Sequence, residues 1–99
     1  MNAAPRQRAV RMRIEGLVQG VGFRAWVQRT AASLGLDGWV RNRRDGGVEV
    51  VVKGAEQAVA RMTALCHDGP PGSDVSAVTI FDERDPVPPG FEVRPTGCC

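Results

Sequence analysis

The chain has 99 residues, 42% of them hydrophobic, a size that suits one compact domain with a modest core. No stretch approaches the roughly 18 apolar residues of a membrane span, and residues 1–8 lack the apolar run of a signal peptide. We therefore expect a cytoplasmic protein with no membrane contact. The formal net charge is +2 and the arginines are spread along the chain, which argues against an extended nucleic-acid surface.

The first half of the chain predicts an arm, a strand, a glycine-rich loop and a helix. Residues 1–8 are polar and contain Pro5, so we expect a flexible arm. Apolar and charged residues alternate over 10–15, which indicates a strand with one buried face. Apolar residues then recur at helical spacing over 23–34, and Gly35 stands where a left-handed C-terminal cap belongs. The side chains expected in the core are Val10, Met12, Ile14, Phe23, Trp26, Val27, Thr30, Ala31 and Leu34.

The second half repeats strands and a helix. Asp45, Gly46 and Gly47 are a strong reverse-turn signal, so strands at 38–43 and 48–53 should form a hairpin. Further along the chain we expect an amphipathic helix over 55–67, a loop over 68–74, a strand around 78–81, a proline-rich turn over 82–90 and a short last strand at 91–93. Cys66 should pack within the helix, and the terminal Cys98-Cys99 pair should be disordered.

This βαββαβ order, with an additional short strand, predicts the α+β class. It indicates a ferredoxin-like split βαβ sandwich, in which a mixed, mostly antiparallel sheet of four to five strands carries both helices on one face. We expect residues 9–95 to form this domain and residues 96–99 to form a C-terminal tail.

The loop from Gly16 to Gly22 has the features of a phosphate site. Its glycines let backbone N–H groups converge without hindrance from Cβ atoms, and the following helix adds its positive N-terminal end. Arg24 stands in the first helical turn, where a cation opposes the helix dipole but a guanidinium can grip two phosphate oxygens. A tight loop with a surface arginine is the structural alternative.

The sequence lacks the residues that other kinds of phosphate-binding or phosphatase site require. The segment 20–25 fits the loose G-x-G-x-x-A pattern, but the acidic residue expected roughly 20 positions later is missing. A cysteine nucleophile at Cys66 would need an arginine where Gly72 stands, and His67 is expected to cap a helix end. The Asp, Glu, His and Cys residues show no metal-ligand spacing, so we expect no metal and no other cofactor.

The groups that remain are backbone amides, one arginine and a neutral polar group. They suffice for hydrolysis of a phosphate anhydride if the leaving group is a carboxylate, because that anion needs no proton. Such a site has only to hold the phosphoryl group and place a water in line with the bond that breaks. The amide of Asn42 both donates and accepts hydrogen bonds, so it can orient this water. Support of the following turn is the alternative role for Asn42.

Two blocks of the sequence stand at a defined separation. They are Gly16-x-Val18-Gln19-Gly20-Val21-Gly22-Phe23-Arg24 and Gly38-Trp39-Val40-Arg41-Asn42-x₃-Gly46-x-Val48-x₅-Gly54, with Ala32-Ser33-Leu34-Gly35-Leu36 between them. In these blocks, and from about residue 9 to residue 94, the chain resembles the acylphosphatase family.

The resemblance implies a ferredoxin-like acid anhydride hydrolase, which splits acyl phosphates into a carboxylate and inorganic phosphate. It implies that Arg24 binds the phosphoryl group and that Asn42 places the water, with the substrate phosphate taking the proton. The loop amides would be those of Val18, Gln19, Gly20, Val21, Gly22 and Phe23. We further expect inorganic phosphate or sulfate to compete for the site, no nucleic-acid partner, and a monomer.

Two alternatives stay open at this point. Similar domains begin the large carbamoyl-transferring proteins of hydrogenase maturation, so a regulatory or carrier role with carbamoyl phosphate as ligand is one. An RNA-binding module is the other, because split βαβ sheets often present stacking aromatics to single strands. The chain has three phenylalanines, two tryptophans and no tyrosine, and Phe23 and Trp26 are needed in the core, which disfavours RNA binding.

Overall fold

The computed structural model describes residues 6–97, which form one five-stranded sheet and two helices. The elements are β1 (Gln7–Leu17), α1 (Phe23–Ser33), β2 (Asp37–Asn42), β3 (Val48–Ala55), α2 (Glu56–Asp68), β4 (Asp74–Asp82) and β5 (Phe91–Val93). This order confirms the predicted α+β, ferredoxin-like fold. Residues 1–5 of the expected arm and the Cys98-Cys99 pair lie outside the described residues.

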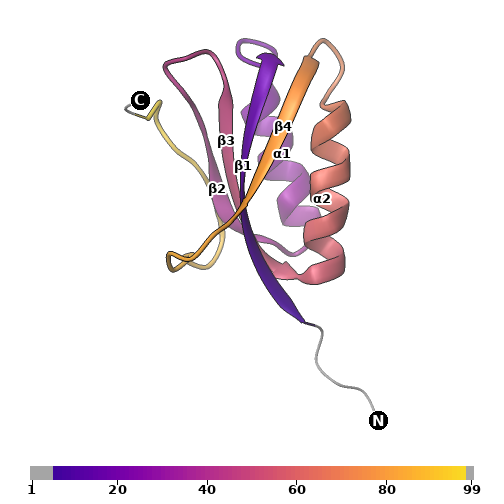
Figure 1. Cartoon of the computed structure of the whole chain (residues 1–99), viewed down its shortest axis with the longest axis vertical. Coiled ribbons are helices and arrows are strands. Elements are labelled where there is room, and N and C mark those ends of the chain that lie inside the picture. Colours follow the sequence, from indigo (N-terminus) through magenta and orange to yellow (C-terminus); the bar gives the residue numbers. More distant parts are fainter. Residues whose placement is uncertain (1–5, 98–99) are drawn as a thin grey trace.

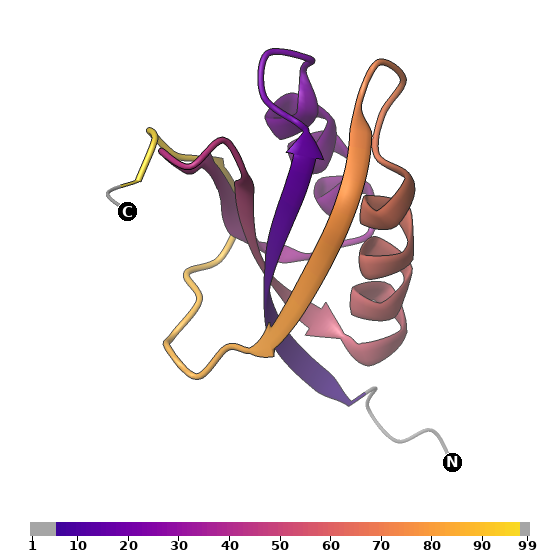
Figure 2. The same ribbon diagram turned by 45° about the horizontal axis from the view of Figure 1, so that its top comes forward.

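The strands lie in the order β4-β1-β3-β2-β5. The first four pair antiparallel and β5 runs parallel to β2, which gives the mixed, mostly antiparallel sheet that was predicted. Both helices cover one face of the sheet and leave the other face open (Figures 1 and 2). Neither helix has the length and apolar composition that a membrane crossing requires.

Side-chain alternation gathers the core on the covered face. The register of β1 and β3 opposes Val10 with Val52, Met12 with Val50 and Ile14 with Val48, and all six side chains are fully buried. The helices add Phe23, Val27 and Ala31 from α1 and Val59, Met62 and Cys66 from α2. Trp26, Thr30 and Leu34, which were expected in the core, are half-buried at its margin. Burial raises the pKa of the Cys66 thiol to about 12, so this cysteine is a packing residue, as predicted.

The ends of four strands differ from the expected bounds, and the smallest difference is in β2, which covers Asp37–Asn42 rather than 38–43. β1 begins at Gln7, inside the expected arm, because its pairing with β3 continues to the end of that strand. β3 in turn extends to Ala55, so α2 begins at Glu56. β4 begins at Asp74 rather than near Val78, since it pairs with β1 along almost its whole length. In each case the neighbouring strand decides where a strand ends.

Gly38 of β2 has a position that only glycine can fill. Its φ is +145°, and an added Cβ atom would stand 1.8 Å from the carbonyl oxygen of Val51 in β3. We expect Gly38→Ala to lower the free energy of unfolding by about 3 kcal/mol or more, because the neighbouring backbone cannot move away. Gly72→Ala is the control: its φ of +88° is also positive but the added atom meets nothing within 4 Å. That variant should lose only about 1 kcal/mol. Denaturant unfolding measures both, and equal losses would contradict the clash.

Candidate active site

The loop between β1 and α1, residues 18–22, presents free backbone N–H groups. Gly20 and Gly22 have φ angles of +75° and +77°, the left-handed region that glycine adopts without strain. In the part of the chain that the structure describes, no amide of residues 18–22 donates a hydrogen bond to a protein acceptor. Gly22 is also the N-cap of α1, which has no side-chain cap and no acidic residue in its first turn. The loop therefore offers an anion unpaired donors and a positive helix end.

A pocket of about 260 Å³ opens beside this loop. It is lined by Val18, Gly20, Gly22, Phe23, Arg24, Ala25, Asn42 and Val93. Phe23 is buried in the core and fixes the start of α1. Arg24 is half-buried and is the only charged residue of this lining. Among residues 6–97, no carboxylate lies within ion-pair distance of Arg24, so its guanidinium is available to a ligand.

Asn42, the last residue of β2, enters the same pocket from the sheet. Its backbone carbonyl accepts a hydrogen bond of 3.0 Å from the amide of Gly97, and Gly97 also forms a parallel bridge with Arg43. The end of β2 therefore has a backbone neighbour on each side. The contact was not predicted, because residues 96–99 carry no strand pattern and were expected to be a tail.

The side chain of Gln19 joins the loop to the β2–β3 turn. Its Nε2 atom donates to the carbonyl oxygens of Arg43 at 2.7 Å and Gly47 at 2.8 Å. The turn is itself closed, because the Arg43 amide donates to the Gly47 carbonyl at 2.8 Å. Asp45 accepts from the Gly47 amide and from the Arg43 guanidinium, and these bonds hold the pKa of Asp45 below its usual value. The loop and the strand end at Asn42 are thus connected through one turn.

The structure brings Arg24 and Asn42 to one pocket, but only some of the predicted loop residues line it. Val18, Gly20, Gly22 and Phe23 line the pocket, whereas Gln19 and Val21 do not. Ala25 and Val93 were not predicted. Ala25 follows from its place in the first turn of α1, whereas Val93 reaches the pocket only because β5 pairs with β2, which no sequence signal showed.

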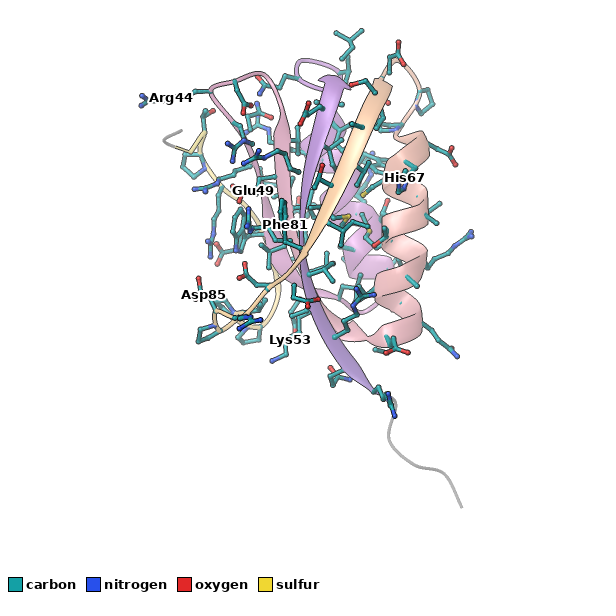
Figure 3. All side chains as sticks on the ribbon, in the orientation of Figure 1. Arg44, Glu49, Lys53, His67, Phe81 and Asp85 are labelled. Carbon is teal, nitrogen blue, oxygen red and sulfur yellow. The ribbon has the colours of Figure 1, made fainter. Side chains whose placement is uncertain are left out.

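The other groups considered from the sequence lie elsewhere. His67 is on α2, with its Nδ1 atom 2.9 Å from the Thr63 carbonyl oxygen, so it contacts a helix carbonyl as expected (Figure 3). Within residues 6–97, the His, Cys, Asp and Glu side chains form no group of three or more that could hold a metal ion.

A split βαβ sheet with a pocket at the N-terminus of its first helix defines a small ferredoxin-like α+β domain, and comparison with known proteins identifies its family. The acylphosphatase family model matches residues 10–93. An acylphosphatase from Rhizorhabdus wittichii is 48% identical over 92 residues, which are 93% of each chain. The structure of an acylphosphatase from Coxiella burnetii superposes with a TM-score of 0.85 and 34% identity, covering 89% of this chain and 93% of that one.

The chain belongs to the acylphosphatase family, and it is a hydrolase of acyl phosphates. A crystal structure of full-length HypF in its phosphate- and nucleotide-bound form is also similar, with a TM-score of 0.85 and 26% identity. That similarity covers 99% of this chain but 13% of HypF, so it concerns one part of a larger protein.

Gln19 provides a test of the connection between loop and turn. We expect Gln19→Ala to weaken inhibition by phosphate roughly threefold to tenfold and to lower kcat, because two hydrogen bonds that hold the loop are lost. Gln28→Ala is the matched control, since Gln28 donates one exposed bond of 3.3 Å to the Phe91 carbonyl. Steady-state kinetics of both variants measure kcat and the inhibition constant of phosphate. If Gln19→Ala behaves like Gln28→Ala, the bonds of Gln19 do not organise the site.

Proposed function

We propose that Arg24 and the amides of the loop from Val18 to Phe23 bind the phosphoryl group of the substrate, and that Asn42 positions the attacking water. One observation carries the proposal: a guanidinium and backbone amides that have no protein partner among residues 6–97 line a single pocket together with Asn42. The guanidinium fork and the N–H groups complement phosphate oxygens and stabilise the negative charge of the transition state.

The chemistry then needs no tuned acid or base. Asn42 holds a water in line with the anhydride bond, the water oxygen bonds to phosphorus, and the electron pair of the broken P–O bond leaves on the carboxylate. The proton of the water passes to a phosphoryl oxygen. The acyl group extends toward Ala25 and Val93, the partly exposed apolar part of the lining.

Three further features belong to this proposal. Inorganic phosphate and sulfate should compete with the substrate, because they present the same oxygens to the loop. No metal should be needed, because the protein groups alone balance the phosphate charge. A cytoplasmic location and a monomeric state are predictions from the sequence.

Chelation tests whether the reaction depends on a metal. We expect release of phosphate from benzoyl phosphate to continue at its full rate in EDTA, since the guanidinium and amides supply the positive charge. Alkyl phosphate monoesters should be cleaved far more slowly, because their leaving groups need a proton donor that the pocket lacks. Loss of activity in EDTA that a divalent cation restores would contradict the proposal.

Substitution separates the roles of Arg24 and Asn42. Arg24→Ala should lose phosphate binding and turnover together, because the guanidinium contacts the phosphoryl group in both ground and transition states. Asn42→Ala should lower kcat by about 10²-fold or more with little change in phosphate affinity, because the water matters mainly in the transition state. Arg29→Ala, an exposed arginine of the same helix, is the control and should keep full activity. A folded Asn42→Ala protein with normal kcat would remove Asn42 from its role.

A further inference from the structure

Glu49 of β3 is a charged residue buried on the open face of the sheet. Its side chain is 6% exposed, and Figure 3 labels it on β3. Three arginines surround its carboxylate: Arg41 Nη2 lies 2.8 Å and Arg43 Nη1 3.7 Å from Oε1, and Arg11 Nη1 lies 3.4 Å from Oε2. Arg41 adds a hydrogen bond from Nε to Oε1 at 2.8 Å. One carboxylate thus joins β1, β2 and the turn before β3.

The two arginines on Oε1 are the chain neighbours of Asn42. Because successive side chains of a strand point to opposite faces, Arg41 and Arg43 reach the open face while Asn42 faces the pocket. Arg41 is paired directly across from Glu49 in the β2–β3 ladder. The Glu49 carboxylate therefore contacts Arg41 and Arg43, the residues before and after Asn42, on the face of the sheet opposite the pocket.

Arg43 connects the Glu49 carboxylate with the loop between β1 and α1. Its guanidinium lies between Glu49 and Asp45, and its carbonyl oxygen accepts the Gln19 hydrogen bond. The side chain of Arg43 is only 12% exposed, although it carries a charge. Removal of the Glu49 charge should loosen the contact of this guanidinium with β3, while its shorter contact with Asp45, at 3.0 Å, keeps the turn in place.

We propose that Glu49 is a positioning residue for the hydrolysis: it acts through Arg41 and Arg43 to set the position of Asn42, and it contacts no substrate. This inference rests on the proposed role of Asn42 as the residue that places the water. If Glu49 only formed a structural ion pair, its loss would lower the free energy of unfolding without a selective effect on kcat.

The test is the variant Glu49→Gln, which keeps the shape of the side chain and removes its charge. We expect kcat for benzoyl phosphate to fall about tenfold or more, while the inhibition constant of inorganic phosphate changes by less than about threefold. The matched control is Glu92→Gln, the same substitution in β5 at a 57% exposed carboxylate that pairs with Arg94 at 3.1 Å. It should leave kcat unchanged.

A double variant then asks whether Glu49 acts through Asn42. In the Asn42→Ala background, Glu49→Gln should cause no further loss of kcat, because two residues that act as one unit are not additive. An additive loss, or a normal kcat in folded Glu49→Gln, overturns the inference while the role of Asn42 stands. Full activity of Asn42→Ala alone instead defeats the proposed function and this inference with it.

If Glu49→Gln does not fold, Arg41→Lys replaces it. This variant keeps the charge but loses the forked contact to Oε1, so it should show the same selective fall of kcat to a smaller degree. Equal changes in kcat and in phosphate inhibition by Arg41→Lys would also overturn the inference.

Discussion

The antiparallel register of β1 with β3 is the constraint on which the rest of the structure depends. A shift by one residue would turn the three aliphatic side chains of β1 to solvent and bring Arg11 against the helices. The same register places the end of β1 beside the start of β3. The loop after β1 therefore meets the turn before β3, which is how Gln19 reaches a carbonyl 24 positions further along the chain.

Arg24 differs in its surroundings from four arginines on the open face of the sheet. On the open face, Arg11, Arg41, Arg43 and Arg94 each contact a carboxylate. Arg24 stands on the other side of the sheet, where the described residues place no carboxylate near it. Under the role proposed for Arg24, a phosphoryl group would bind a guanidinium for which no carboxylate of residues 6–97 competes.

The sequence was sufficient to predict the element order and the buried face of β1, because both depend on periodicity. The convergence of Arg24 with Asn42 followed from the two blocks shared with the acylphosphatase family. The sequence was insufficient for the ends of β1 and β4, since those depend on how far a neighbouring strand continues. The bonds of Gln19, the arginines around Glu49 and the contact of Gly97 with Asn42 were also not foreseen. The bonds of Gln19, the contact of Arg11 with Glu49 and the contact of Gly97 with Asn42 join segments distant in the chain, and no local pattern distinguishes a side chain that makes such a contact from one that does not.

The outer edge of β4 has a consequence for the behaviour of the protein in concentrated solution. β4 pairs with β1 on one side only, so its other row of backbone groups could accept a strand from a second molecule, and Ile80 and Phe81 are partly exposed there. The strand begins at Asp74 and ends at Asp82. Two copies joined antiparallel about the middle of β4 would set each aspartate opposite the other, and like charges in facing positions repel. The two aspartates at the ends of β4 therefore oppose this antiparallel pairing of two copies.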